Sequence, residues 1–432
     1  MRFRGRQYSL DGRRRIHFLR ANDFTSLRRF RRDFFTRRAS AGGNAAGSWL
    51  CLLRQKRHVP EGAYRMTQEE QYMSRAIRLA RQGAGYTSPN PMVGCVVVKD
   101  GRIISEGYHE RCGEYHAERN ALLRCREDPA GADLYVTLEP CCHHGKTPPC
   151  TEIILEKKIG HVYVGSMDSN PLVAGKGVQI LRDHGIPVTT GILEEECLKL
   201  NEVFYHFITH GTPYVAAKYA MTLDGKIACA SGDSKWVTNE SSRQDVQQLR
   251  KLYSGIMVGI GTVLADDPML NCRIAEGADP VRIVCDSGLR IPMESKLVQT
   301  AREIPTIVAA GADAINQKKE KAEQLTRAGV EVLCAGQTRP DLKELMRQLG
   351  EKKIDSVLIE GGGTLNASAF EAGIVRKVYV YIAGKIAGGK DAPTPVRGRG
   401  VERMADALAL SDLEVSLLDG DLRVVGYLKE KQ

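Results

Sequence analysis

No apolar run in this 432-residue sequence approaches the roughly 18 residues that a membrane-spanning helix requires. The longest early apolar stretch, residues 48–53, is far too short, and no small-residue cleavage pattern follows it. These absences argue against a membrane span and against a secretory signal peptide. The remaining composition, with 42% hydrophobic and 26% charged residues, is ordinary for a globular protein of two or three domains.

The sequence also lacks the cysteine framework of small secreted proteins. Its 12 cysteines are mostly dispersed along a long chain, and several lie in apolar runs, such as Cys95 in VGCVVV and Cys285 in IVCDS. Such cysteines are typical of small buried side chains in a reducing compartment, so we expect a cytoplasmic protein. Only Cys141, Cys142 and Cys150 form a cluster.

Acidic residues are scarce in one region. Residues 1–65 contain 17 Lys and Arg but only 4 Asp and Glu, whereas the rest of the chain contains 45 basic and 48 acidic residues. The segment has no sustained helix or strand period, and its charge opposes compaction, so we expect it to lie outside the folded domains. It can be interpreted as a nucleic-acid-binding arm, an organelle transit peptide, or a non-native extension before a true start at Met66. We favour the extension, because an amphipathic helix follows Met66 directly.

From Met66 onward, helical and strand patterns alternate, which indicates an α/β fold. In the first half we predict strands on either side of a turn at 99–101, strands at 133–139 and 161–167, and helices over 72–80, 116–125, 150–158, 178–183 and 192–208. After a plausible boundary at 210–213, we predict helices over 239–252 and 341–349 and strands at 214–220, 226–231, 255–261, 281–287, 305–310, 330–335, 355–363 and 375–384. No sequence repeat links the halves, so we predict two different domains, 66–211 and 212–432.

A histidine upstream of the cysteine cluster gives the cluster a chemical meaning. The motif HAE opens a predicted helix, and the strand after it leads to a Pro-Cys pair and then to a further cysteine. Zinc prefers tetrahedral sites of imidazole and thiolate, and a catalytic site leaves the fourth position for water. His116, Cys141 and Cys150 supply such a set. Glu118 is then the carboxylate that could move a proton from water to a leaving amine, as in the zinc-dependent base deaminases.

Two features complicate this interpretation. A closed structural zinc site with Cys142 as fourth ligand is the main alternative, although adjacent cysteines rarely fit one tetrahedron without strain. In addition, the deaminase signature separates its cysteines by two residues, whereas here the eight residues CHHGKTPP lie between Cys141 and Cys150. This longer loop carries His143 and Lys146, and the lysine adds a positive charge near the site.

The segments HAE and TLEPCCHHGKTPPC, with SPNPMVGCVVV before them and SNPLVAGKG after them, resemble the bifunctional pyrimidine deaminase/reductase family of riboflavin biosynthesis. The resemblance covers essentially all of 66–432. It implies a cytidine-deaminase-like α/β/α domain followed by a dihydrofolate-reductase-like α/β domain. It also implies one zinc ion per chain on His116, Cys141 and Cys150, with Glu118 as proton shuttle.

The same resemblance implies the first substrate, 2,5-diamino-6-(5-phosphoribosylamino)pyrimidin-4(3H)-one, whose 2-amino group is replaced by water. The sequence positions that match this substrate pocket are Asn90, His109, His143 and Lys146.

The second half offers weaker signals of its own. In IEGGGTLN the position that would complete a G-x-G-x-x-G motif is Asn366, although such a turn could still hold phosphate through backbone N–H groups. Arg250 and Arg273 could clamp a phosphate. The resemblance implies hydride transfer from NADPH to the ribose C1′ of the deaminated product. Its NADPH positions match Ala220, Trp236, Thr262, Asp266, Ser287, Gly361, Gly362, Gly363 and Thr364. Its substrate positions match Ser234, Arg250, Leu270, Arg273 and Glu360.

Two other functions stay open on the sequence alone. A nucleoside or RNA-base deaminase with a basic RNA-binding arm is disfavoured by the long CHHGKTPP loop and by a second half without interleaved aromatic and basic residues. A non-catalytic, zinc-stabilised binding protein would have no need of Glu118. We therefore predict a cytoplasmic bifunctional enzyme that acts on small pyrimidine ribotides, binds neither nucleic acid nor membranes, and forms a homo-oligomer.

Overall fold

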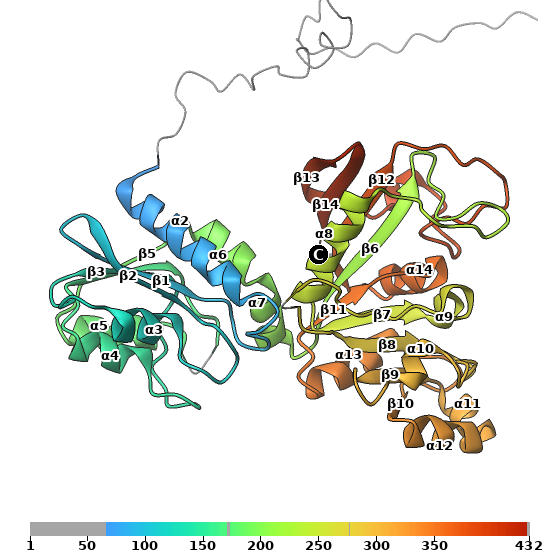
Figure 1. The fold of residues 1–432 in the computed structure, drawn as a ribbon, viewed down its shortest axis with the longest axis horizontal. Coiled ribbons are helices and arrows are strands. Elements are labelled where there is room, and N and C mark those ends of the chain that lie inside the picture. Colours follow the sequence, from blue (N-terminus) through green and yellow to red (C-terminus); the bar gives the residue numbers. More distant parts are fainter. Residues whose placement is uncertain (1–65, 171–172, 276, 430–432) are drawn as a thin grey trace, which may run out of the picture. The chain divides into compact units, whose positions relative to one another are not determined.

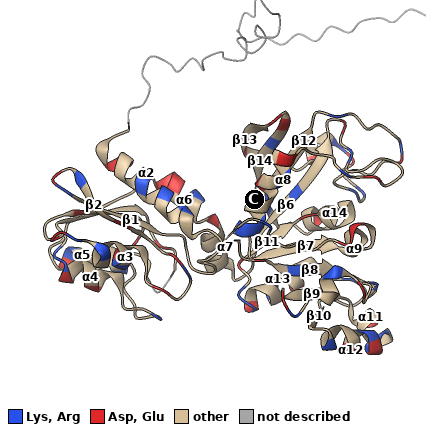
Figure 2. Cartoon of the chain, in the orientation of Figure 1, with Lys and Arg blue, Asp and Glu red and all other residues tan. Residues whose placement is uncertain are grey.

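Two β-sheets, of five and nine strands, organise the computed structural model, which describes residues 66–170, 173–275 and 277–429 (Figure 1). The basic segment 1–65, which we predicted to be an extension, lies outside these residues. Within the described residues, no helix combines the length and apolar character needed to cross a membrane. Basic and acidic residues are interspersed along the described helices and strands (Figure 2).

The five-stranded sheet has the order β2-β1-β3-β4-β5. Strand β1 pairs antiparallel with β2 and β3, whereas β3, β4 and β5 run parallel. Its strands are β1 (Gly94–Lys99), β2 (Arg102–Tyr108), β3 (Asp133–Leu138), β4 (His161–Ser166) and β5 (Val188–Thr190). The helices of this part are α2 (Gln68–Ala80), α3 (Ala117–Arg124), α4 (Cys150–Glu156), α5 (Lys176–Asp183), α6 (Glu194–Leu200) and α7 (Glu202–His210), with a short 3₁₀ turn, η1 (Arg81–Gly83).

Alternation along the strands explains why this sheet is covered on both faces. Successive side chains of a strand point to opposite faces. On β1, Cys95 and Val97 belong to one apolar cluster with residues of α3, α4 and α5. Val96 and Val98 belong to another cluster with residues of α2 and α6. A strand that is buried on both faces has a continuous run of apolar residues in the sequence. With helices packed on both faces of the sheet, this part of the chain is an α/β/α sandwich.

The nine-stranded sheet has the order β10-β9-β8-β7-β11-β6-β12-β14-β13. Its strands from β10 to β12 are parallel, and β14 and β13 complete the sheet with antiparallel pairs. The strands are β6 (Tyr214–Thr222), β7 (Gly255–Gly259), β8 (Val281–Cys285), β9 (Thr306–Ala310), β10 (Val330–Cys334), β11 (Ser356–Ile359), β12 (Val375–Ala383), β13 (Leu410–Leu418) and β14 (Asp421–Leu428).

Helices cover this second sheet as well. They are α8 (Glu240–Leu252), α9 (Ile260–Asp266), α10 (Lys296–Gln299), α11 (Ala312–Gln317), α12 (Lys319–Arg327), α13 (Leu342–Glu351) and α14 (Gly363–Glu371), with a 3₁₀ turn, η2 (Met404–Asp406). Met257 on β7 belongs to an apolar cluster with residues of α13 and α14, whereas its neighbours Ile256 and Val258 belong to one with residues of α9 to α12. The parallel part of this sheet around β7 is therefore also buried on both faces.

The structure corrects two of the predicted elements. The segment 226–231, predicted as a strand, is irregular, because its backbone pairs within turns: Thr222 donates to the Lys226 carbonyl and Cys229 donates to the Asp233 carbonyl. The single helix predicted over 192–208 is two helices that meet at Asn201. The Asn201 side chain accepts from the N–H of Met92 and donates to its carbonyl, so tertiary contacts hold the break.

The strand prediction also ended too early, because it placed nothing after residue 384. The β13–β14 hairpin completes one side of the sheet.

Candidate active sites

Three ligand atoms converge beyond the end of β3. His116 is the N-cap of α3, Cys141 follows β3, and Cys150 is the first residue of α4. His116 Nδ1 lies 3.4 Å from Cys141 Sγ and 3.6 Å from Cys150 Sγ. Among the described residues, this is the one group of three or more His, Cys, Asp or Glu whose ligand atoms all lie within 4.8 Å of one another. Cys142, considered above as a fourth ligand, is not part of it.

The electrostatics of this group suit a cation. Hydrogen bonds from Cys150 and His116 outweigh burial and lower the pKa of Cys141 to about 4, which favours the thiolate that a metal ion requires. The backbone N–H of Cys150 donates to Cys141 Sγ at 3.3 Å. One imidazole, two sulfurs and a fourth position without a protein ligand fit the donor set of catalytic zinc.

Glu118 lies beside the ligand atoms and is 2% exposed. Its Oε2 atom has no hydrogen-bond partner in the described part of the chain. Burial, followed by the negative charge of Cys141, raises the pKa of Glu118 to about 7. A carboxyl group that changes protonation near neutral pH, and that has an oxygen free to bind, has the properties of a proton shuttle.

A cavity of about 490 Å³ opens onto this group, and its size suits a small ligand. His116, Glu118 and Cys141 line it, while Cys150 is buried behind them. The four positions predicted for the first substrate all line the same cavity: Asn90, His109, His143 and Lys146. The Asn90 amide nitrogen lies 3.3 Å from His109 Nε2, and His109 Nδ1 lies 3.0 Å from the carbonyl of Tyr115. The imidazole is therefore held from both sides, and burial lowers its pKa.

Sequence analysis missed two acidic residues that line this cavity. Asp168, 9% exposed, lines the cavity, and burial raises its pKa to about 6. Glu139 also lines it, and its carboxylate accepts the N–H groups of Gly175 at 2.9 Å and Val178 at 3.1 Å. The available signal was that both acids directly follow buried strands, where ligand sites of parallel sheets occur.

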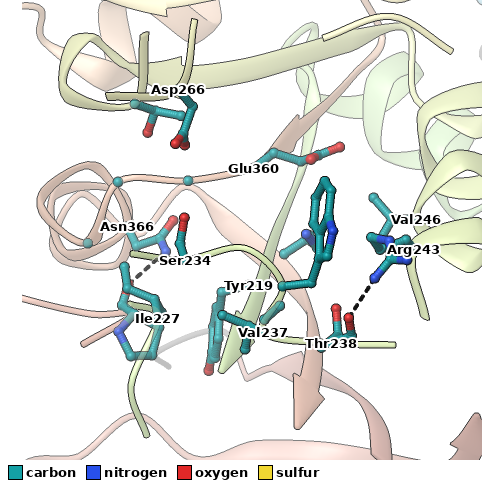
Figure 3. A pocket seen from close by; sticks show the side chains of 18 of the residues that line it. Tyr219, Ile227, Ser234, Val237, Thr238, Arg243, Val246, Asp266, Glu360 and Asn366 are labelled. Carbon is teal, nitrogen blue, oxygen red and sulfur yellow. Dashed lines mark hydrogen bonds between the residues drawn. The ribbon is translucent and has the colours of Figure 1, made fainter. Parts of the chain in front are cut away.

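A second cavity, of about 320 Å³, lies at the carboxyl ends of β6 and β11 and beside α8 and α9 (Figure 3). Of the positions predicted to bind NADPH, those that line it are Ala220, Trp236, Thr262, Asp266, Gly361, Gly362 and Gly363. Of the positions predicted to bind the substrate, those that line it are Ser234, Arg250, Arg273 and Glu360. Three predicted positions are not among its lining residues: Ser287 and Thr364 are exposed, and Leu270 is packed in the apolar cluster under α9 to α12.

The glycine turn before α14 has a conformational reason for its composition. Gly361 has φ +146° and Gly362 has φ +89°, values that only glycine adopts without strain. A Cβ on Gly363 would approach the Thr394 carbonyl oxygen to 2.6 Å. The turn therefore brings bare backbone to the cavity wall, where its N–H groups can meet a ligand.

Two of the charged groups of this second cavity pair with each other. Arg250 binds Glu360 through two contacts, Nε to Oε1 at 2.7 Å and Nη2 to Oε2 at 2.9 Å, with side chains 11% and 6% exposed. Arg250 also donates to the Asn271 carbonyl at 2.9 Å. Because its guanidinium is committed in this way, the exposed Arg273 is the better placed of the two arginines to meet a phosphate.

Lys218 is the main charged residue that sequence analysis missed here. It lines the cavity from β6, and burial lowers its pKa. A lysine inside the apolar strand YVAAKYA was the signal that could have identified it. Asp224, in the motif LDGK, instead accepts the N–H groups of Ala387 at 3.0 Å and Gly388 at 2.7 Å. It closes a turn and does not line the cavity.

The remaining unpredicted lining residues are Tyr219, Ile227, Val237, Thr238, Arg243, Val246, Gln247, Asn366 and Pro395. Most are apolar or lie in the loop between β6 and α8, where the sequence carries no distinctive pattern.

The two folds and sites together define a class of protein: a zinc-dependent deaminase joined to a dinucleotide-dependent reductase. Comparisons with known proteins agree with both halves. The family model of the cytidine and deoxycytidylate deaminase zinc-binding region matches residues 66–166, and the model of the RibD C-terminal domain matches residues 213–424.

Full-length relatives give the family. Riboflavin biosynthesis protein RibD of Actinobacillus pleuropneumoniae is 52% identical over 366 residues, which cover 84% of this chain and 96% of the relative. RibD of Escherichia coli K12 is 39% identical over 374 residues, covering 83% of this chain and 100% of the relative.

A crystal structure agrees with these relatives. The diaminohydroxyphosphoribosylaminopyrimidine deaminase/5-amino-6-(5-phosphoribosylamino)uracil reductase of Thermotoga maritima is 39% identical with a TM-score of 0.75, covering 84% of this chain and 99% of that one. This chain therefore belongs to the RibD family of riboflavin biosynthesis proteins. It is a bifunctional enzyme with zinc-dependent deaminase and NADPH-dependent reductase activities.

Proposed function

We propose that residues 66–211 deaminate 2,5-diamino-6-(5-phosphoribosylamino)pyrimidin-4(3H)-one and that residues 212–432 reduce the ribosyl group of the product to ribityl. The relative from Thermotoga maritima has both of these activities in its name. The observation that carries the deaminase assignment is the buried, unpartnered Glu118 oxygen beside three converging ligand atoms.

In the first step, His116, Cys141 and Cys150 would hold zinc, which when bound lowers the pKa of water and so supplies a nucleophile at neutral pH. Glu118 takes a proton from the attacking water and gives it to the departing 2-amino group. A C–O bond forms, a C–N bond breaks, and ammonia leaves. Asn90 and His109 would hold the pyrimidine edge, and Lys146, with its positive charge, would meet the phosphate of the ribotide.

In the second step, NADPH when bound would supply a hydride for C1′ of the ribosyl group. A proton must then reach the oxygen that leaves C1′ and becomes a hydroxyl. Lys218 is a suitable proton source, because burial lowers its pKa and its side chain lines the cavity. Arg250 holds the Glu360 carboxylate in place for the ribose hydroxyls, and Arg273 would bind the phosphate. The backbone of the glycine turn and the side chains of Trp236 and Thr262 would hold NADPH.

We also propose that the enzyme is a homo-oligomer. Strand β13 is the last strand of its sheet, and Leu413, Val415 and Leu417 on it are 58%, 64% and 73% exposed. An exposed edge strand with apolar side chains can pair with the edge strand of another molecule. Antiparallel pairing of two β13 strands about a twofold axis would cover this edge in both copies. Light scattering after size exclusion tests this, because Val415→Lys should yield a monomer if β13 forms the interface.

A cytoplasmic location fits the cysteine chemistry, because no cysteine of the described residues forms a disulfide. We propose that the enzyme acts on free ribotides and not on nucleic acid. The near balance of basic and acidic residues after residue 65 supports this, because nucleic-acid binding surfaces carry an excess of positive charge.

One assay tests the proposal as a whole. The purified full chain is incubated with the diaminopyrimidine ribotide with and without NADPH, and ammonia, NADPH absorbance and bound zinc are measured. We expect ammonia without NADPH, NADPH oxidation only once the ribotide has been deaminated, and one zinc per chain. Deamination of cytidine or tRNA without action on the ribotide would contradict the proposed substrate, and active protein without zinc would contradict the mechanism.

A further inference from the structure

Trp236 lines the reductase cavity although its side chain is 64% exposed. It lies in the irregular segment between β6 and α8, where burial does not hold the indole ring in place. A ring that forms part of a binding wall needs some other interaction to fix it. Arg243 provides one, because its guanidinium carbon lies 4.7 Å from the centre of the Trp236 ring. This distance is within the range of a cation–π contact.

Arg243 holds the same segment at a second point. Its Nη1 donates to the Thr238 carbonyl at 2.7 Å, and Figure 3 shows these two residues next to each other at one side of the cavity. The acidic partner of Arg243 is Glu240, at 3.9 Å and 77% exposed, which makes this ion pair weak. The guanidinium therefore interacts mainly with Trp236 and Thr238.

The helix that carries Arg243 is firmly anchored. Asp421, 5% exposed, accepts the N–H of Asn239 and the hydroxyl of Ser242, both at 2.8 Å. Asn239 is the N-cap of α8, and its amide also donates to the Leu418 carbonyl at 2.6 Å. The start of α8 is thus tied to the β13–β14 turn, so Arg243 extends from a rigid base toward a segment without regular structure.

We propose that Arg243 is a positioning residue for NADPH binding in the reductase. By holding the Trp236 ring and the Thr238 carbonyl against α8, it forms the cavity wall before the cofactor arrives. Because this wall is already ordered in the free protein, NADPH binding loses less conformational entropy. This inference rests on the proposed assignment of Trp236 to NADPH, and it requires no contact between Arg243 and the cofactor.

The sequence allows a direct optical test, because it contains two tryptophans, Trp49 and Trp236. In the full chain, W49F leaves Trp236 as the single tryptophan. In this background we would compare R243M, R243K and W236A. The matched control is R327M on α12, where Arg327 is 76% exposed and pairs with Glu323. The measurements are acrylamide quenching of Trp236 in the free protein, dissociation constants for NADPH and NADH, reductase kinetics, and the deaminase rate of the same chain as a check on folding.

We expect R243M to increase the acrylamide quenching of Trp236. The dissociation constants for NADPH and NADH should rise by the same factor, about three- to tenfold, because a cation–π contact and a charge-assisted hydrogen bond are lost. The KM for NADPH should rise while the reductase kcat changes little. R243K should retain part of the effect of arginine, because it keeps the charge. R327M should match the W49F parent, and all four variants should keep the deaminase rate.

Three results would overturn the inference. Unchanged quenching in R243M would show that Arg243 does not hold the indole. Weaker binding of NADPH with unchanged binding of NADH in R243M would show that Arg243 contacts the 2′-phosphate of NADPH directly and does not act through Trp236. Cofactor binding weakened in W236A but normal in R243M would also contradict it.

The underlying assignment fails separately, if W236A binds both cofactors normally. If the deaminase rate of R243M is lost, that variant has not folded, and R243K is measured in its place. Unchanged quenching and cofactor binding in R243K would then overturn the inference.

Discussion

The two sites of this enzyme are built in different ways. The proposed metal ligands of the deaminase lie within the short segment 116–150, and their ligand atoms lie within 4.8 Å of one another. The reductase cavity draws its lining from residues between 218 and 395, on strand ends, loops and helices of the larger sheet. A metal site needs particular atoms at one point, so its residues are distinctive even in the sequence. A dinucleotide cavity uses backbone groups and common side chains, so its residues are recognised mainly by position.

The same contrast appears in two buried glutamates. Glu118 is 2% exposed, has an unpartnered oxygen, and burial raises its pKa to about 7. Glu360 is similarly buried, but Arg250 overcomes the effect of burial and lowers its pKa. The first carboxyl group can move a proton, and the second is a fixed negative charge. Environment, and not residue type, thus sets the role of each acid.

The largest expected effect comes from Glu118→Gln. Deaminase kcat should fall by about 10²- to 10⁴-fold, because the amide cannot shuttle the proton. Bound zinc should remain, and reduction of the pre-deaminated ribotide should be unchanged, which provides a control within the same chain. Loss of zinc would show that Glu118 is a ligand, and an unchanged deaminase rate would favour a binding protein.

Glu360→Gln should affect stability as well as reduction. It leaves Arg250 buried without its counter-charge, which costs about 3–5 kcal/mol. Urea denaturation should show this loss, whereas Glu118→Gln should change the free energy of unfolding by less than about 1 kcal/mol, because no counter-charge is left behind. If both variants are equally destabilised, the contrast between a shuttle and a fixed charge is wrong.

A pH titration should reveal a third kind of group, one outside both cavities. Burial, with His210 and Arg376 nearby, lowers the pKa of His206 to about 4, below the value near 6.5 of an unfolded histidine. The unfolded chain therefore binds the proton first, so stability is full above about pH 6.5 and falls as the pH drops toward 4.

After allowance for partial exposure, we expect His206 to contribute about 1–2 kcal/mol between pH 7 and pH 4. His206→Gln should flatten this part of the stability curve. An identical pH dependence in the wild type and His206→Gln would refute the prediction.

Deletion of residues 1–65 should have the smallest effect. Both cavities are lined by residues after position 84, and the segment carries the excess positive charge that neither reaction requires. Deaminase and reductase rates of the truncated chain should equal those of the full chain within error. A large loss of either rate would give the basic segment a function in catalysis.

The match between predicted positions and observed cavities follows the same contrast. The three predicted metal ligands, Glu118 and the four positions predicted for the deaminase substrate lie together, because motif spacing and local elements bring them there. In the reductase, Ser287, Leu270 and Thr364 do not line the cavity, and the 226–231 strand is absent. Those predictions depended on how distant segments approach one another, which no local pattern encodes.

By itself, the sequence determined the chemistry that this protein can perform, because zinc ligation and proton transfer need specific side chains at specific spacings. It also determined the alternation of helices and strands, since burial requires apolar periodicity. Only the tertiary structure decided which charged side chains are paired and which are not. It paired Arg250 with Glu360, left Glu118 with an unpartnered oxygen, and placed Arg243 against Trp236. Charge state and ring position depend on desolvation and on partners far away in the chain, and these exist only once the fold has formed.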